Sequence, residues 1–480
     1  MKKIIAGILL AAIMVGTLAA CSLGTKKTSS DDVPTLVWYV PGDQQPDLAQ
    51  INEEANKIVE PAIGARIDLR FIDTGAYSQK LDMMMASQEE FSLCFVGYLY
   101  NYAKAVEKGG LYDITDLLAE TDLESLFPDY CWNAAKYNGR IYGLPNQQIM
   151  VSSYCEMVRK DLAEKYNLDV NSIYSLKDLE PFLDEIKKNE TGIFPANVHW
   201  AQFFNDLRAN PTYETITSQV TYDRATGKVF PFYDEKGLYE KAKALHEWYK
   251  KGYIRADVAT LKDDSDFRAG KYALINNYYL PSVENDVKNT TGHEYICLPN
   301  TITNGILKTN SILATCTAVS ATCKYPEKAV AFLELINKNK DLYNLICFGI
   351  EGKHYEKLDD EYIKAEKSSG YFPNAAWKFG NQFNAYLQEG QASDEWDKTV
   401  ELNEKATRSG ILGLFFDTDE ILTELAQVSK VWNKYDVMIN RGGIDPDTYW
   451  EDMKTDFKKA GIEKVVSLYQ KQIDEFLAKK

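Results

Sequence analysis

Three short apolar runs near the start of the chain decide the fold: TLVWYV at 35–40, ARIDLRFID at 65–73 and FSLCFVGYL at 91–99. Each run is rich in β-branched and aromatic residues and has the length of a buried strand. Between the runs, apolar residues recur at helical spacing over 48–58 and over 77–84. This alternation of strand and helix predicts an α/β fold with a largely parallel sheet covered by helices.

The same pattern predicts where a ligand binds. Ligands of open α/β sheets bind beyond the carboxyl ends of the strands, which indicates the loops after Val40 and Asp73. The chain has 480 residues, too many for one compact core, so two or more lobes are expected.

The N-terminus has the features of a secretory signal. Lys2 and Lys3 precede an uncharged apolar stretch over 4–20, which ends Leu-Ala-Ala directly before Cys21. This resembles a bacterial lipobox, so residues 1–20 are predicted to be a lipoprotein signal peptide and Cys21 the lipidated residue, with palmitate among its acyl chains. An ordinary cleaved signal with an incidental Cys21 is the alternative. Residues 21–32 are short and polar and are expected to form a flexible stalk.

The composition argues against several classes of protein. The net charge of −16 makes nucleic acid an improbable partner, because binding to phosphates needs clustered Lys and Arg. Besides Cys21 there are seven cysteines, an odd number at irregular spacings, so no disulfide framework is predicted.

No motif indicates catalysis or a metal. The four histidines form no HExxH motif or i, i+4 pair, and no GxSxG elbow, P-loop or Rossmann fingerprint is present. Asp263, Asp264 and Asp266 partly match a calcium loop but lack its glycine and terminal glutamate, so they are predicted to cap a helix before Phe267. We therefore expect no catalytic residue, no metal and no cofactor.

Aromatic residues make up 12% of the chain, and many lie in predicted loops. Aromatic faces suit the apolar face of a sugar ring, and amide side chains suit its hydroxyls. The predicted ligand-binding residues are Trp38, Tyr77, Asn146, Gln147, Trp200, Asn276, Tyr278, Tyr279, Trp377 and Asn381.

Several motifs follow one another in an order typical of a known family. They are GGLYDITDLL at 109–118, YNGRIYGLPNQ at 137–147, SSYCEMVRKDLAEKYNL at 152–168, FRAGKYALINNYYLP at 267–281 and KYPEKAVAFLELI at 324–336. In this order they resemble the family 1 extracellular solute-binding proteins of sugar ABC importers. The segment at 373–386 and the tail at 443–477 resemble a Firmicutes subgroup with an extra C-terminal domain, which favours a Gram-positive source.

The resemblance implies a two-lobed periplasmic-binding-protein-like (type II) fold with an inter-lobe cleft and a hinge. It implies an N-terminal lobe of residues 33–145 and 312–358, and a C-terminal lobe of 146–311 and 359–480 that includes a helical extension. It also implies a non-enzymatic, monomeric lipoprotein at the outer face of the cell membrane that binds a small polar solute, with an oligosaccharide favoured, and delivers it to ABC permease subunits. The alternatives are a secreted glycosidase or esterase, a peptide-binding protein and a sensory lipoprotein.

Overall fold

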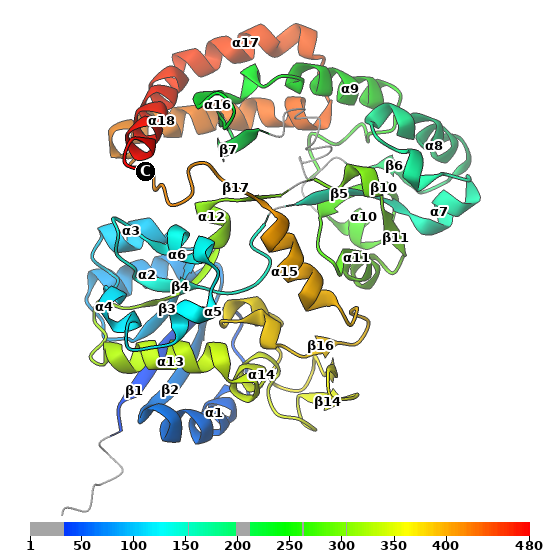
Figure 1. Ribbon diagram of the computed structural model, residues 1–480. Helices are drawn as coiled ribbons and strands as arrows, with labels where there is room; N and C mark the ends of the chain where they lie inside the picture. The colour runs from blue at the N-terminus through cyan, green and yellow to red at the C-terminus, as the bar shows by residue number, and fades with distance from the viewer. Residues whose placement is uncertain (1–32, 152, 198–211, 262–263, 304) are drawn as a thin grey trace, which may run out of the picture.

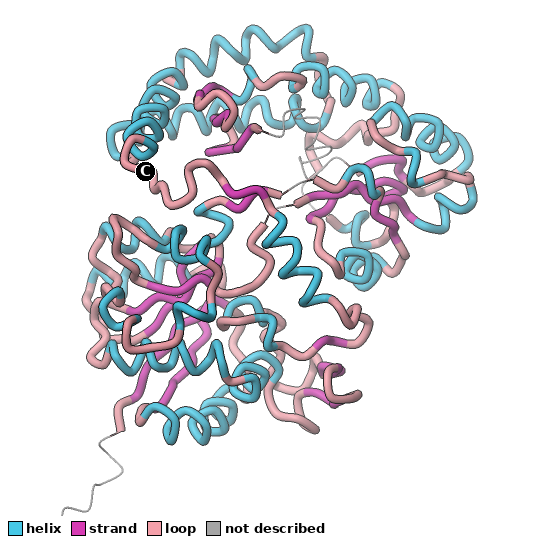
Figure 2. The backbone as a smooth tube through the Cα atoms, viewed as in Figure 1, coloured by secondary structure: helices cyan, strands magenta, loops and turns pink. Residues whose placement is uncertain are grey.

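The computed structural model describes residues 33–151, 153–197, 212–261, 264–303 and 305–480. Figure 1 shows two α/β lobes, one at the lower left and one at the right, with the C-terminal helices lying across the top. The two largest sheets lie one in each lobe, and smaller groups of strands lie outside them (Figure 2). The predicted two-lobed α/β class is confirmed.

The first lobe contains a five-stranded sheet in the order β2-β1-β3-β13-β4. Strands β1, β2 and β3 are parallel, as predicted, and β13 runs antiparallel between β3 and β4. The elements of this lobe are β1 (Thr35–Pro41), α1 (Leu48–Ile63), β2 (Arg66–Ile72), α2 (Tyr77–Ala86), β3 (Leu93–Gly97), α3 (Tyr102–Glu107), α4 (Thr115–Leu118), α5 (Leu123–Leu126), α6 (Asp129–Ala135), β4 (Gly143–Pro145), α12 (Thr309–Ile312), β13 (Thr315–Val319), α13 (Pro326–Lys338) and α14 (Lys340–Phe348).

Helix α1 shows how local sequence builds this lobe. Its buried residues Ile51, Ala55 and Val59 are four apart and so face the sheet together. On an adjacent face, Asn52 and Asn56 each donate to and accept from the backbone of β2, at 2.7–3.1 Å. These amides satisfy backbone groups of an edge strand, which blunts its tendency to pair with another chain.

The second lobe is built on a four-stranded sheet in the order β11-β5-β10-β6. Strand β5 is antiparallel to both of its neighbours, whereas β10 and β6 are parallel. The elements of this lobe are β5 (Tyr154–Arg159), α7 (Lys160–Lys165), α8 (Leu176–Asn189), β6 (Phe194–Ala196), α10 (Ser265–Arg268), β10 (Tyr272–Tyr278), α11 (Val283–Thr291) and β11 (Tyr295–Cys297).

A third packing unit joins a β-hairpin region to the end of the chain. It has its own apolar core, shared by β7 (Tyr213–Thr217), β8 (Val220–Asp223), β9 (Lys228–Pro231), α9 (Leu238–Lys250), α16 (Leu422–Arg441), α17 (Pro446–Lys459) and α18 (Ile462–Leu477). Helix α9 links this unit to the second lobe, because Ala242 packs in the core of the unit while Leu245 and Trp248 pack in the core of the lobe.

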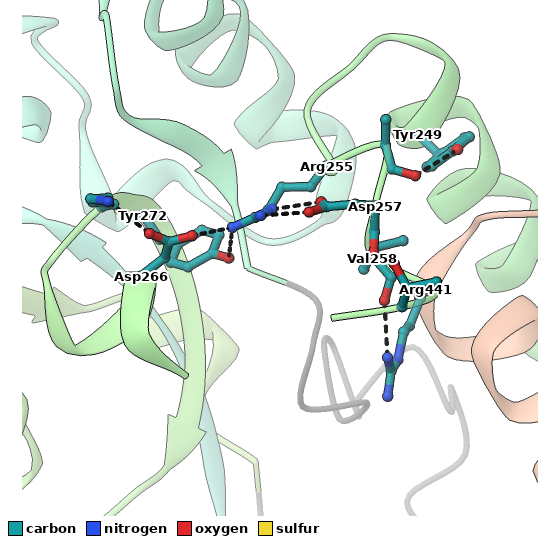
Figure 3. Close-up of polar contacts among 10 residues, drawn as sticks. Tyr249, Arg255, Asp257, Val258, Asp266, Tyr272 and Arg441 are labelled. Atoms are coloured by element: carbon teal, nitrogen blue, oxygen red, sulfur yellow. Dashed lines mark hydrogen bonds and ion pairs between the residues drawn. The ribbon is translucent and has the colours of Figure 1, made fainter. Parts of the chain in front are cut away.

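A polar connection adds to this attachment (Figure 3). The Arg441 guanidinium at the end of α16 donates to the Val258 carbonyl at 3.0 Å. In the loop that carries Val258, the Arg255 guanidinium pairs with Asp257 and Asp266, and it lies 4.2 Å from the Phe194 ring centroid. The loop is therefore held between the second-lobe sheet and the C-terminal helices.

The predicted domain boundary at residue 358 is wrong. Ile363, Tyr371 and Phe379 are fully buried in the core of the first lobe, and the Asp47 N–H donates to the Gly370 carbonyl at 3.0 Å. Strands β14 (Tyr355–Lys357), β15 (Tyr362–Ala365) and β16 (Leu387–Gln388) form a small sheet beside this core. Residues 359–388 return to the first lobe because their scattered aromatic residues bury apolar surface there. No periodic pattern in the sequence predicts this contact.

Within the residues that the structure describes, three segments connect the two lobes. They are residues 146–151, the segment around β12 (Ile306–Leu307), and the end of α15 (Glu395–Lys405) with β17 (Thr407–Arg408). Strands β12 and β17 pair in parallel, and the Asn403 amide bonds to the backbone of Gln148 and of Met150 at 2.6 and 2.8 Å. The crossing segments thus bond to one another, as expected for a hinge that bends as one unit.

Candidate functional site

An aromatic pair stands at the carboxyl ends of the parallel strands in the first lobe. The half-buried Trp377 ring lies 6.4 Å from Phe95 in β3 and 6.1 Å from Tyr98 just beyond it, measured between centroids. The Tyr98 side chain is 56% exposed. The chain turns toward this position at Gly97, where φ is +137° and an added Cβ would lie 2.1 Å from the Ala314 carbonyl oxygen, so only glycine fits.

A buried lysine supports the tryptophan. The Lys378 ammonium donates to the Pro41 carbonyl at 2.9 Å and lies 4.8 Å from the centroid of the Trp377 ring. Burial lowers the pKa of Lys378, and the nearby Asp43 carboxylate opposes that shift. This arrangement ties the Trp377 segment to the loop after β1, which is one of the two loops that the strand order indicated.

The three predicted amides of this lobe have different surroundings. Asn146 is 2% exposed, and both ends of its side chain bond within the protein, to the Lys378 carbonyl and the Thr317 hydroxyl. Asn146 therefore holds Lys378 in place and does not face a ligand. Gln147 is also buried, and it pairs through its backbone with the Asn381 segment, whereas the Asn381 side chain is half-buried and accepts from the Phe383 N–H at 3.1 Å.

Two other predicted ligand-binding residues lie in the core, and these predictions are wrong. Trp38 has no exposed surface and packs edge-on against Phe332 and Phe379 at 5.5 and 5.7 Å. Tyr77 is equally buried, and its hydroxyl bonds with the backbone of Phe95. Both residues are on the inward faces of their elements, where an aromatic ring contributes packing instead of recognition.

The second lobe presents aromatic and amide residues where β5 and β10 pair. Tyr278 is directly opposite Tyr154, with ring centroids 4.7 Å apart, and it remains 53% exposed. Asn276 is opposite Glu156 and donates to its carboxylate at 2.9 Å. Tyr279, which follows Tyr278, is half-buried, and burial raises its pKa. Trp200 lies outside the described residues.

A cavity of about 290 Å³ lies between the first lobe and the C-terminal unit. Its walls come from the start of α3, from β7, from α12 and from residues 409–419. Phe415 closes one side against Tyr102 and Tyr137, at 6.1 and 5.2 Å. The sequence reasoning missed this cavity as well as Tyr98, Tyr154 and Lys378, although the apolar run ILGLFF at 411–416, which ends in two adjacent phenylalanines, was a signal that could have been used.

Comparisons with known proteins decide the family. The model of the bacterial extracellular solute-binding protein family matches residues 46–342, which is more than half of the chain. This chain belongs to the bacterial extracellular solute-binding proteins. A second model, a domain of unknown function (DUF3502), matches residues 410–478 of this solute-binding protein, the part that contains α16 to α18.

Individual relatives cover nearly the whole solute-binding protein. A carbohydrate ABC transporter substrate-binding protein of Streptococcus pneumoniae is 29% identical over 475 residues, 96% of each chain. The crystal structure of the N-glycan transport solute binding protein NgtS from the same species superposes with a TM-score of 0.81 at 26% identity, covering 93% of this chain and 100% of that one. FusA of that species in complex with kestose has a TM-score of 0.62 at 16% identity, which indicates a shared fold.

Crystal structures of NgtS with bound glycans also match this solute-binding protein. NgtS in complex with Man1GlcNAc and with Man5GlcNAc matches this solute-binding protein with TM-scores of 0.70 and 0.67, against 0.81 for NgtS alone. The present structure therefore superposes better on the structure of NgtS alone than on either of its glycan complexes.

The aspartates that partly matched a calcium loop have structural roles where they are described. Asp264 precedes α10, but its carboxylate accepts from the Arg268 guanidinium at 2.9 Å and not from the helix N-terminus, so the cap predicted for Asp264 is wrong, while Asp263 lies outside the described residues. Asp266 pairs with Arg255 and Lys271. Within the part of the chain that the structure describes, no three His, Cys, Asp or Glu residues are grouped to hold a metal ion, and no helix is long and apolar enough to cross a bilayer.

Proposed function

We propose that this solute-binding protein captures an oligosaccharide outside the cytoplasm and delivers it, unaltered, to an ABC importer. The observation that carries this proposal is the half-buried Trp377 ring beside the exposed Tyr98, at the carboxyl ends of β1 and β3, in a chain of this family. An aromatic ring with one accessible face can cover the apolar face of a pyranose, and amides such as Asn381 suit its hydroxyls.

The second lobe supplies the opposing contacts in this proposal. Tyr278, Tyr279 and Asn276 lie on that lobe, so a glycan held by Trp377 and by these residues contacts both lobes. Only a ligand with a higher affinity for the closed form shifts the equilibrium toward closure. The segments that bond together around β12 and β17 are the hinge for this movement.

The class of glycan follows from the relatives. NgtS has been crystallised with Man1GlcNAc and Man5GlcNAc, so oligosaccharides of mannose and N-acetylglucosamine are the first ligands to test. For membrane attachment we propose that the signal peptide is removed before Cys21 and that acyl chains on Cys21 hold the protein at the outer face of the membrane. The permease subunits of the importer are the proposed protein partners.

A thermal-shift screen followed by calorimetric titration tests the proposal. The ligands are mannose–N-acetylglucosamine oligosaccharides, maltooligosaccharides and peptides, each applied to the chain with the Cys21→Ser substitution. A glycan present at about one hundred times its Kd stabilises the folded state by about 2.7 kcal/mol and raises the melting temperature. Stabilisation by peptides alone would contradict the oligosaccharide assignment, and chromatographic detection of shortened glycan would favour a glycosidase.

A further inference from the structure

Two cysteine side chains of the second lobe contact each other. The Sγ atoms of Cys155 and Cys297 are 3.2 Å apart, although the residues are 142 positions apart in the chain. Among the seven cysteines that the structure describes, all of them with free thiols, no other pair makes a sulfur–sulfur contact. The cysteine spacing in the sequence did not indicate this pair.

The strand register places the two thiols on one face. Cys297 in β11 is opposite Met157 in β5, and Cys155 lies two residues before Met157. Side chains two residues apart in a strand point to the same face, so Cys155 and Cys297 are diagonal neighbours across the strand pair. A disulfide bond is about 2.05 Å long, so the sulfur atoms need to approach by only about 1.2 Å from their 3.2 Å separation.

The surroundings allow oxidation from one side. Strand β11 is at the edge of the sheet, and Cys297 is partly exposed, whereas Cys155 is 1% exposed. The contact with the Cys297 thiol, together with burial, raises the pKa of Cys155, which favours its thiol form. Cys297 is therefore the thiol that an external oxidant reaches first.

We propose that Cys155 and Cys297 form a reversible redox site that crosslinks β5 to β11. With a small-molecule disulfide as oxidant, the Cys297 thiolate attacks one of its sulfur atoms and releases one thiol. The Cys155 sulfur, after losing its proton to solvent, then attacks the Cys297 sulfur and releases the second thiol. Two protein thiols are thereby oxidised to one disulfide, and the small-molecule disulfide is reduced to two thiols.

The crosslink would lie next to the candidate ligand-binding residues of the second lobe. Cys155 lies between Tyr154, which contacts Tyr278, and Glu156, which accepts from Asn276. A covalent link from Cys155 to the edge strand holds this part of β5 in its folded position, so the oxidised protein is more stable to heat, by about 5 °C, than the reduced protein. Formation of this crosslink depends on the thiol geometry and not on which solute binds.

Thiol counting tests the proposal. The chain with Cys21→Ser has seven cysteines. It is incubated with oxidised glutathione, then denatured and alkylated with iodoacetamide, and its intact mass is measured. We expect seven alkylated thiols before oxidation and five after it, a peptide map that joins the Cys155 and Cys297 peptides, and recovery of seven after reduction.

Matched variants assign the pair. Cys155→Ser and Cys297→Ala each leave six thiols, and neither is expected to form an internal disulfide. The control Cys347→Ser removes a buried thiol that lies elsewhere, in α14, so it should still lose two of its six thiols on oxidation. Seven alkylated thiols after oxidation of the parent chain, a disulfide that maps to other cysteines, or a stable glutathione adduct on Cys297 would each overturn the proposal.

Discussion

Truncation of Trp377 is the sharpest test of the candidate site. An aromatic side chain buries about 150–250 Å² when it is fully covered, and Trp377 is half-buried, so we take a ligand that covers about 60 Å² of its ring. At about 25 cal/mol per Å² this area contributes about 1.5 kcal/mol, and stacking adds about 0.5–1.5 kcal/mol. We therefore expect Trp377→Ala to weaken glycan binding at least tenfold, equivalent to about 1.4 kcal/mol.

The same substitution also removes packing within the protein. Trp377 contacts Phe95 and Tyr98, so the variant should lose some stability, but less than the roughly 3–5 kcal/mol lost on truncating a fully buried tryptophan. The control is Trp38→Phe, which alters a tryptophan with no exposed surface in the same lobe. This control should lower the melting temperature and leave the affinity unchanged.

The assay is calorimetric titration well below both melting temperatures, with thermal unfolding of each variant without ligand. Normal affinity in Trp377→Ala would remove Trp377 from the site. An equal loss of affinity in Trp38→Phe would show that the effect arises from general destabilisation of the lobe and would refute the stacking argument.

Three further predictions concern the anchor, the interface between α15 and α11, and the turn after β3. Cys21→Ser should move the protein from the membrane to the soluble fraction, and unchanged fractionation with an unchanged mass of the N-terminal peptide would contradict lipidation. Burial raises the pKa of Glu395 above its ordinary 4.5, so the folded state holds this proton more tightly than the unfolded state does. The difference in the free energy of unfolding between the parent chain and Glu395→Gln should therefore fall as the pH rises from about 4.5 toward neutrality. A difference that does not change with pH would show that the carboxyl does not titrate in this way. Gly97→Ala should lower the free energy of unfolding by about 2 kcal/mol or more, because it combines a steric clash with a positive φ. Gly109→Ala, at φ +69° with no atom within 4 Å of the added Cβ, should lower it clearly less. Equal denaturation midpoints for the two variants would refute the steric argument.

Local sequence was sufficient for several elements of the first lobe. The runs over 35–40, 65–73 and 91–99 became the parallel strands β1, β2 and β3, because short runs of β-branched and aromatic residues have few alternatives to a buried strand. Helix α13 begins at Pro326 and buries Phe332 and Ile336, as its periodicity predicted. In both cases the information lies within a few residues of the element.

Local sequence was not sufficient for the site. Trp38 and Trp377 are the same residue type, and each has another aromatic residue within two positions. Trp38 is nevertheless fully buried, whereas Trp377 is half-buried beside the exposed Tyr98. The difference depends on Phe332 and Phe379, which cover Trp38 from distant parts of the chain. Burial is set by such long-range contacts, and no window of neighbouring residues reports them.

The same reason separates what the sequence by itself determined from what only the tertiary structure decided. The parallel α/β start of the chain and the family motifs are local patterns, so they could be identified before any coordinates, and the secretory signal is a prediction from a pattern of the same kind. The return of residues 359–388 to the first lobe, the use of the Asn146 side chain to hold Lys378, and the meeting of Cys155 with Cys297 all join residues that are far apart along the chain. Packing of the two sheets and of the segments between them decides those contacts, because buried apolar area and satisfied polar groups are properties of the folded whole.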